Sequence, residues 1–321
     1  MRVLNLSVSY ERSQFMTRII TLTPNPALDY AVTADFVEPN RKLRCHHPQM
    51  HPGGGGINVA RSCSRFHAHT LAIFTAGGVY GDALVKSLAI ENVPMRMIPI
   101  SGETRLAFHV KNAKEENEYR FNLPGAEMSE NEIDHFLTAI REEADPGDFV
   151  VASGSLPPGA PGDFWAQAAR VAKDRGARFV LDSISGLDAA LEEGVYMLRQ
   201  NEHEYEALSG KKLTWPDEIE SYAKGLVEKG QVQAMVVSHG GDGSLMATKD
   251  GVFSAPSFKV KASSAVGAGD SFVGGLLTAL ARGDDPTTAL RFGMAAAGAT
   301  RMSEGTALFD PADVQKLMSS K

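Results

Sequence analysis

The sequence contains very little cysteine. Only Cys45 and Cys63 occur among its 321 residues. Two cysteines cannot form the disulfide framework of a small secreted protein, and the C-x-x-C spacing typical of zinc ligands is absent. We therefore expect both residues to be reduced thiols in a cytoplasmic protein.

Long hydrophobic runs are absent as well. No segment approaches the roughly 18 consecutive apolar residues that a membrane-spanning helix requires, so the sequence predicts none. Residues 1–15 also lack the continuous apolar core of a signal peptide. We expect residues 1–15 to be a disordered extension of a domain covering 16–321, with Met16 as an alternative natural start.

The chain has no excess of positive charge. It carries 39 acidic and 32 basic residues, for a formal net charge of −7. General binding to nucleic acid or to an anionic membrane requires a basic face, so this balance argues against both. It does not argue against a small anionic ligand, because local charges decide that.

Short β-like runs alternate with amphipathic helical stretches along most of the chain. Such alternation predicts an α/β fold with a mostly parallel sheet and helices on both faces. Ser129 followed by Glu132 has the spacing of a helix-capping box. The predicted strands are 19–22, 71–74, 149–152, 178–181 and 234–237, and the predicted helices are 57–66, 82–91, 129–143, 166–173, 217–228, 269–281 and 286–302.

Two segments break this alternation. Residues 28–50 and 104–122 lack a helical period and alternate like antiparallel strands. A small separate sheet has one face to bury, so it suits a lid over a site, a dimer interface, or both. We expect these segments to form such a lid.

The strongest functional signal is the cluster Val266–Asp270, of sequence VGAGD, which opens a predicted helix. The small residues Gly267, Ala268 and Gly269 allow backbone amides at a helix start to point at an anion. Asp270 beside them could accept the proton of an attacking hydroxyl during phosphoryl transfer. Taken by itself, the motif is equally consistent with Asp270 being an acidic residue that merely stabilises the first turn of a helix.

A second glycine cluster, PGGGGINVA at 52–60, also leads into a predicted helix. Gly54 and Gly55 permit close approach of a ligand to the backbone, and Asn58 in the first turn can bond sugar hydroxyls. The cluster matches neither the P-loop nor the dinucleotide-binding fingerprint. The alternative is a flexible turn without a ligand.

Weaker signals come from charged and polar residues elsewhere. Lys42 and Arg44 stand at alternate positions, so they would share one face of a strand and could clamp a phosphate, although a solvated strand face fits as well. Asn201 and Glu204 could organise a hydrated Mg²⁺, or could be ordinary surface residues. Strand ends expected near a ligand contribute Ser155, Ser238, Gly240 and Gly243.

Together these residues resemble the ribokinase-like (PfkB) carbohydrate kinases. PGGGGINVAR at 52–61 and VGAGDSFVGG at 266–275 are similar to the two signature regions of that family, and the likeness extends from Thr21 to Gly305. The resemblance implies a three-layer α/β/α domain with a mostly parallel sheet and a small β-sheet lid. It also implies a homodimer formed through the lid.

The finer resemblance implies transfer of phosphate from ATP to fructose 6-phosphate. TLTPNPALD at 21–29, KLRC at 42–45 and SGSLPPG at 153–159 are similar to the ATP-dependent enzymes with that glycolytic activity. Tagatose-6-phosphate kinases and 1-phosphofructokinases on the same fold usually carry G-G-K-G, whereas this run contains only glycine. Those two activities remain the alternatives, together with a non-catalytic sugar-phosphate sensor.

Roles follow from the resemblance position by position. It implies Asp270 as general base, the Gly267–Gly269 amides as anion hole, and Mg²⁺ managed by Asn201 and Glu204. Residues implied along ATP are Arg199, Asn201, Ser238, Gly240 and Gly243. Residues implied around the phosphosugar are Asp29, Lys42, Arg44, Gly54, Gly55, Asn58, Arg105 and Ser155.

Three positions depart from the family pattern. His203 replaces a lysine expected near the nucleotide phosphates, from which we expect weaker or more pH-sensitive ATP binding. Ala265 stands where threonine is usual, and Ala307 where arginine is usual. A monovalent-cation site, such as one for K⁺, is expected to use the carbonyls of Ser264 and Val266.

Overall fold

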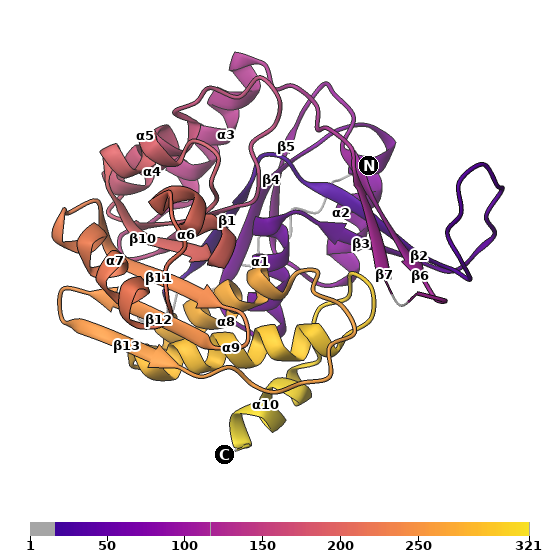
Figure 1. Ribbon diagram of the computed structural model, residues 1–321. Helices are drawn as coiled ribbons and strands as arrows, with labels where there is room; N and C mark the ends of the chain where they lie inside the picture. Colours follow the sequence, from indigo (N-terminus) through magenta and orange to yellow (C-terminus); the bar gives the residue numbers. More distant parts are fainter. Residues whose placement is uncertain (1–16, 116, 321) are drawn as a thin grey trace.

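The computed structural model describes residues 17–115 and 117–320, so the expectation about residues 1–15 lies outside the described residues. The chain forms a nine-stranded sheet between two layers of helices, and a four-stranded sheet that extends from one side. Figure 1 shows the smaller sheet running outward from the main sheet and ending in the loop between β2 and β3. The predicted three-layer fold with a β lid is confirmed.

The main sheet has the order β13-β12-β11-β10-β9-β8-β1-β4-β5 and is parallel from β11 to β5. At the other end of the described sheet, β12 pairs antiparallel with β11, and β13 pairs antiparallel with β12. Its strands are β1 (Ile19–Thr23), β4 (Thr70–Ala76), β5 (Met95–Pro99), β8 (Phe149–Ser153), β9 (Arg178–Asp182), β10 (Val195–Asn201), β11 (Val232–His239), β12 (Gly243–Thr248) and β13 (Gly251–Ala255).

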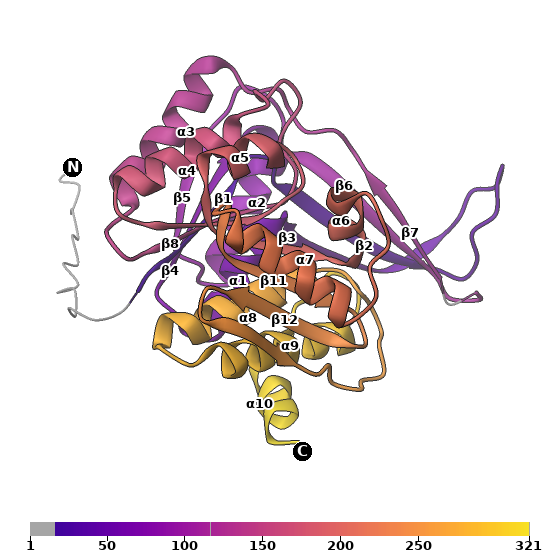
Figure 2. The same cartoon turned by 60° about the vertical axis from the view of Figure 1, so that its left-hand side comes forward.

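Helices cover both faces of this sheet, as Figure 2 shows from a second side. Successive side chains of a strand point to opposite faces, and Ile19 and Ile20 of β1 accordingly belong to two different core clusters. The cluster around Ile20 includes side chains of α3 (Glu130–Glu143), α4 (Phe164–Asp174), α5 (Leu187–Glu193), α6 (Glu202–Ser209) and α7 (Asp217–Glu228). The other face is covered by α1 (Gly55–Arg65), α2 (Gly78–Ile90), α8 (Ala268–Arg282) and α9 (Pro286–Met302), with α10 (Pro311–Ser319) packed on α9.

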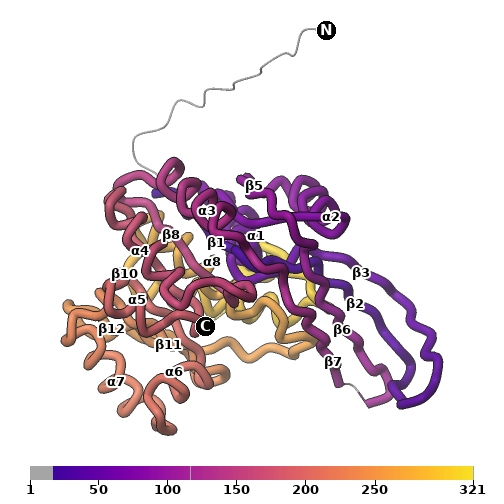
Figure 3. Tube along the Cα trace, turned by 90° about the horizontal axis from the view of Figure 1, so that it is seen from above, coloured from indigo at the N-terminus to yellow at the C-terminus, as the bar shows by residue number. Residues whose placement is uncertain are grey.

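The lid consists of β3-β2-β6-β7 and, in Figure 3, lies on the side of the molecule away from α6 and α7. Its strands are β2 (Ala27–Ala34), β3 (Cys45–Gly53), β6 (Arg105–Asn112) and β7 (Asn117–Asn122). The antiparallel expectation holds for β2–β3 and β6–β7 but is wrong for β2–β6, which is parallel. Each of them follows the carboxyl end of a parallel strand of the main sheet, β2 after β1 and β6 after β5, so they run outward in the same direction.

Local chemistry explains where the helices begin. Ser129 and Glu132 form the predicted capping box of α3, and Asp285 and Asp310 cap α9 and α10, each followed by proline. In contrast, α1 and α8 begin after Gly54 and Gly267, and no side chain of the described residues caps either one. Without a side-chain cap, first-turn amides can donate to a ligand, although Ala268 N already makes a long hydrogen bond of 3.5 Å to Ala265 O.

The predicted helices and strands are found within a few residues of their expected positions, and several short elements were not predicted, among them β5, β10 and α6. Among the described residues, no helix is both long and apolar enough to cross a bilayer.

Candidate active site

The two glycine clusters meet above the carboxyl ends of β1 and β8. The strand order reverses at β1, and ligands of open α/β sheets bind at such a switch point. A Cβ added to Gly55 would lie 2.4 Å from Ser153 Oγ, and one added to Gly56 would lie 2.5 Å from Leu22 O. Glycine is therefore required for α1 to begin directly on these strand ends.

Asp270 lies in the first turn of α8 and is held from α1. Asn58 Nδ2 donates a hydrogen bond of 2.9 Å to Asp270 Oδ2. Asp29, from the lid strand β2, is buried and interacts electrostatically with Asp270. The structure thus brings three predicted site residues together from the lid and the two glycine-led helices.

Burial makes both carboxyl groups weaker acids than usual. Burial raises the pKa of Asp270 to about 7, and the nearby carboxylate of Asp182 raises it further, against the hydrogen bond from Asn58. Burial likewise raises the pKa of Asp29 to about 6, against the positive charges of Arg61 and Arg105. A carboxyl with a pKa near 7 is suited to accept a proton at neutral pH.

A buried ion pair lies beside Asp270. Arg199 Nη1 donates to Asp182 Oδ1 at 3.0 Å, and Arg199 Nη2 donates to Ser238 Oγ at 2.7 Å. Ser153 Oγ donates to the other oxygen of Asp182 at 2.8 Å. Arg199 and Ser238, both predicted to lie along ATP, are therefore adjacent and belong to one polar network with Asp182.

A cavity of about 130 Å³ opens between this ion pair and the start of α8. Its lining includes Arg199, Ser238 and Gly240 together with Ala268 and Gly269 of the predicted anion hole. Gly243 lies at the start of β12, where a Cβ would come within 2.3 Å of Ala255 O. Close packing between strands thus accounts for the glycine at 243. The other four predicted residues, Ser238, Gly240, Ala268 and Gly269, line the same cavity as Arg199.

Asn201 and Glu204 form the capping box of α6. The Asn201 side chain accepts from Glu204 N at 3.1 Å, and the Glu204 carboxylate accepts from Asn201 N at 2.8 Å. Asn201 ends β10 and is the N-cap of α6, so its side chain meets the first turn of the helix that contains Glu204. Burial and Asp182 raise the pKa of Glu204.

Lys42 and Arg44 lie in the connection between β2 and β3, and both are exposed. The expectation that they share a strand face is wrong, because β3 begins only at Cys45. That connection is the loop at the outer end of the lid in Figure 1. Within one chain, the structure therefore does not bring these two cations to Asp270.

Arg105, in contrast, lies at the base of the lid beside Asp29. Arg105 Nη2 donates to Asn25 O at 3.4 Å, while its buried Nε has no partner among the described residues. Asn25 Nδ2 donates to Ser155 Oγ at 3.1 Å and so connects another predicted residue. A guanidinium with unused donors in this position fits an anionic group of a ligand.

Ser264 and Val266 precede the anion hole. Ser264 is buried, and its hydroxyl accepts a hydrogen bond of 3.2 Å from Val266 N. Ser264 N donates to Arg301 O at 3.3 Å. Whether their carbonyls hold a monovalent cation stays a prediction.

Sequence reasoning missed Asp182 and Arg61. Asp182 ends β9, so its place at the carboxyl end of a predicted parallel strand could have identified it. Arg61 follows Asn58 by one helical turn and donates to Asn58 Oδ1 at 3.0 Å. The i, i+3 spacing of Asn58 and Arg61 was the available signal.

Comparison with known proteins places this geometry in a family. The family model described as pfkB family carbohydrate kinase matches residues 23–313. ATP-dependent 6-phosphofructokinase isozyme 2 of Escherichia coli is 38% identical over 94% of this chain and 98% of that protein. A 1-phosphofructokinase of Bacillus subtilis is 34% identical over 89% of this chain and 93% of that protein.

Solved structures agree with the sequence comparison. Phosphofructokinase-2 from Escherichia coli in complex with fructose-6-phosphate matches with a TM-score of 0.88 and 37% identity, over 94% of this chain and 98% of that one. The same enzyme in complex with potassium matches with a TM-score of 0.89 and 38% identity over the same shares. The chain belongs to the pfkB family of carbohydrate kinases.

Proposed function

We propose that this chain transfers the γ-phosphoryl group of ATP to the C1 hydroxyl of fructose 6-phosphate, giving ADP and fructose 1,6-bisphosphate. The observation that carries the proposal is the position of Asp270. It lies at the uncapped start of α8, beside the cavity at Gly269 and hydrogen-bonded to Asn58 of the other glycine cluster. The Escherichia coli relative, solved with fructose-6-phosphate, supports the choice of substrate.

Asp270 would act as the general base. The C1 hydroxyl loses its proton to the carboxylate as its oxygen bonds to the γ-phosphorus, and the bond to the β–γ bridging oxygen breaks to release ADP. Asp29 and Asn58 would orient the sugar hydroxyls, and Gly54 and Gly55 would line the sugar. The amides of residues 267–269 would stabilise charge on the transferred group.

The donor set around Arg199 fits a divalent cation shared with ATP. Asp182 and Glu204 both interact with the Arg199 guanidinium, so two carboxyl groups face a single positive charge. In the described part of the chain, no three His, Cys, Asp or Glu side chains form a ready metal centre. This suits Mg²⁺, which keeps waters and binds through one or two carboxylates plus substrate phosphates.

Glu204, whose backbone amide donates to the Asn201 side chain, would hold that Mg²⁺. The cation would neutralise charge on the ATP phosphates. Arg199, Ser238, Gly240 and Gly243 would flank the nucleotide. We also propose a K⁺ site at the carbonyls of Ser264 and Val266, supported by the relative solved with potassium.

The substrate assignment is tested by ADP release from ATP-Mg²⁺ with a panel of acceptors. The panel contains fructose 6-phosphate, tagatose 6-phosphate, fructose 1-phosphate, fructose, ribose and adenosine. We expect the highest kcat/KM on fructose 6-phosphate. Preference for fructose 1-phosphate would replace this function with that of the Bacillus subtilis relative, and preference for an unphosphorylated acceptor would also remove the proposed phosphate contacts.

The pH dependence of kcat/KM provides a prediction. Asp270 must be ionised to accept a proton, and its pKa is about 7. The rate should therefore fall about tenfold per unit as pH drops below 7 and level off above it. Steady-state kinetics between pH 5.5 and pH 9 would measure this acidic limb.

A variant shows whether the fall of kcat/KM at low pH comes from Asp270 or from titration of the substrates, whose phosphates have a second pKa near 6. Asp182→Asn removes the carboxylate that disfavours ionised Asp270, so the limb should move to lower pH by roughly one unit. Substrate titration is the same with either enzyme. An unmoved limb would show that Asp270 does not set it.

We further propose that the lid forms a homodimer. Met50, Tyr30, Phe108 and Phe121 are register partners across all four lid strands, so they form one apolar row on one face. Met50 and Phe121 are 48% and 53% exposed. Asp29 precedes Tyr30 and faces the opposite side, so pairing through the row would leave the sugar side open.

Dimer formation is tested by replacing Met50 and Phe121 together with aspartate. We expect the wild type to have twice the mass of one chain by light scattering, and the double variant to be monomeric. If Lys42 and Arg44 reach the partner's sugar phosphate, the KM for fructose 6-phosphate should rise as well. Val79→Asp, at a 75% exposed site on α2, is the control that should remain dimeric. A wild-type monomer would refute the lid dimer.

A further inference from the structure

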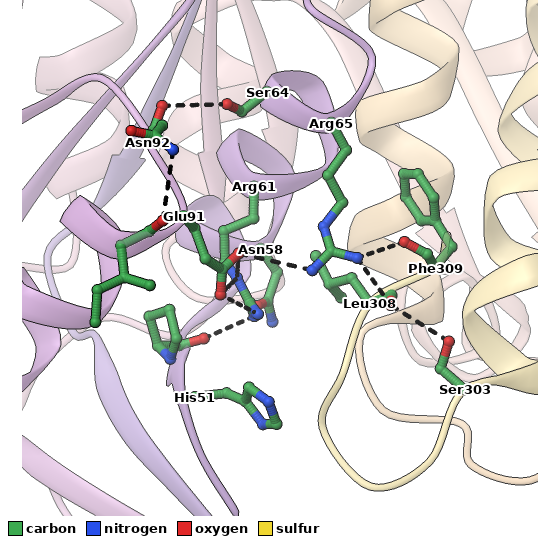
Figure 4. Close-up of polar contacts among 12 residues, drawn as sticks. His51, Asn58, Arg61, Ser64, Arg65, Glu91, Asn92, Ser303, Leu308 and Phe309 are labelled. Carbon is green, nitrogen blue, oxygen red and sulfur yellow. Dashed lines mark hydrogen bonds and ion pairs between the residues drawn. The ribbon is translucent and has the colours of Figure 1, made fainter. Parts of the chain in front are cut away.

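Arg61 is a fully buried cation whose hydrogen bonds converge on the site. Its side chain is 1% exposed. Arg61 Nη1 donates to Asn58 Oδ1 at 3.0 Å and to Pro52 O at 2.9 Å. Its Nε and Nη2 donate to both oxygens of Glu91, at 2.7 to 3.1 Å. Figure 4 shows Arg61 between Asn58 and Glu91.

The contact with Asn58 determines which way that carboxamide faces. A carboxamide has an acceptor oxygen and a donor amino group, and a guanidinium can only donate. Arg61 therefore holds the Asn58 oxygen, which leaves the amino group to donate to Asp270 Oδ2 at 2.9 Å. A rotated carboxamide would place its oxygen against the Asp270 carboxylate and lose both hydrogen bonds.

The contact with Pro52 fixes the neighbouring backbone. Pro52 lies at the end of lid strand β3, directly before the glycines that open α1. Glu91, which follows α2, holds the same guanidinium from the other side. Arg61 thus connects the base of the lid, the first turn of α1 and the C-terminal end of α2 at one buried point.

We propose that Arg61 is a positioning residue for phosphoryl transfer, which acts by orienting the Asn58 carboxamide toward Asp270 and by fixing the glycine segment at Pro52. The proposal rests on the proposed role of Asp270 as general base. Arg61 does not itself touch Asp270, so its hydrogen bonds act on that carboxyl through Asn58, while its charge also acts on Asp29.

Arg65 provides a matched control on the same helix. Like Arg61, it forms an ion pair with Glu91, at 3.7 Å. Its guanidinium donates to Leu308 O at 2.9 Å and to Phe309 O, in the segment before α10. Figure 4 shows the Arg65 guanidinium between Glu91 and the segment of Leu308 and Phe309. Arg65→Met therefore removes a partner of Glu91 without removing a contact of Asn58.

The test is a titration of the Asp270 carboxyl by ¹³C NMR in the enzyme without substrates, with the signal assigned by its loss in Asp270→Asn. Besides Asn58, the groups acting on this carboxyl are Asp182 from β9, Arg199 from β10 and Asp29 from β2. None of them is replaced, but loss of the Arg61 charge raises the pKa of Asp29, and the Asn58→Ala background isolates that contribution. Losing the oriented donor removes a stabilising hydrogen bond from the carboxylate. We expect Arg61→Met to raise the titration midpoint by roughly half to one pH unit.

Further variants show whether the effect passes through Asn58. Asn58→Ala should raise the midpoint similarly, and Arg61→Met should add much less in that background, where only its charge on Asp29 is lost. Arg65→Met should titrate like the wild type. A wild-type midpoint for Arg61→Met, or an undiminished shift in the Asn58→Ala background, would overturn the proposal.

Folding and function are separated in the same experiment. If Arg61→Met does not fold, Arg61→Lys replaces it, because one ammonium group cannot reach Asn58, Pro52 and Glu91 together. The titration needs no turnover. A wild type inactive on fructose 6-phosphate would refute the proposed function, whereas an unshifted Arg61 variant would refute the positioning role alone.

Discussion

Replacing Asp270 with asparagine is expected to lower kcat by about 10²–10⁴-fold, the usual contribution of a general base. Asparagine keeps the shape of the side chain and can still meet Asn58, but it cannot take the proton of the C1 hydroxyl. Binding of fructose 6-phosphate should persist, because Asp29 and Arg105 do not depend on that proton. Steady-state kinetics and calorimetric binding of fructose 6-phosphate would measure the two effects.

A second helix provides the control for this variant. Asp285 caps α9 by accepting from Thr287 N and Thr288 N. Asp285→Asn retains a good N-cap residue, so activity should be unchanged. If Asp270 were only a stabilising acid at a helix start, Asp270→Asn would behave in the same way. Turnover close to that of the wild type would therefore contradict its role as the base.

Arg105→Met is expected to raise the KM for fructose 6-phosphate by roughly 10–100-fold with a smaller change in kcat. A hydrogen bond to a charged group contributes about 1.5–3 kcal/mol, and each 1.4 kcal/mol changes affinity tenfold. Arg105 has a buried donor, Nε, that no described residue satisfies. The 6-phosphate is the proposed partner for that donor.

The acceptor without a phosphate makes this prediction specific. Weak turnover of fructose should be nearly the same in Arg105→Met and in the wild type, because fructose has no phosphate to lose contact with. Arg96→Met, on the preceding strand β5, removes ion pairs to Glu142 and Glu143 and should leave both substrates unaffected. Equal losses on fructose and fructose 6-phosphate would mean that Arg105 supports the lid rather than the phosphate.

The layered fold and the lid segments were predictable from sequence because hydrophobic periodicity reports which faces are buried. The capping box of Ser129 and Glu132 was predictable for a similar reason, since all of its contacts are local. The parallel pairing of β2 with β6 was not, because it depends on where two distant strands leave the main sheet. Lys42 and Arg44 show the same limit, since alternation alone could not distinguish a strand from the loop that they occupy.

The site was predictable where a residue type has few other uses. Glycine at 55 and 56 is required by backbone contacts, and a glycine run before a helix signals such contacts. Asp182 was not predicted because its partner is distant in sequence, and the same holds for the ion pair of Arg61, although not for its contact with Asn58. Arg199 pairs with Asp182 across neighbouring strands, and Glu91, directly after α2, pairs with Arg61.

The central claim, phosphoryl transfer to a phosphohexose, is tested most directly by ³¹P NMR of the wild type with ATP-Mg²⁺ and fructose 6-phosphate. We predict loss of the γ-phosphate signal of ATP and growth of two phosphomonoester signals, from positions 1 and 6 of one sugar, in step with ADP. Unchanged spectra, or phosphate appearing only as the free ion, would contradict the account.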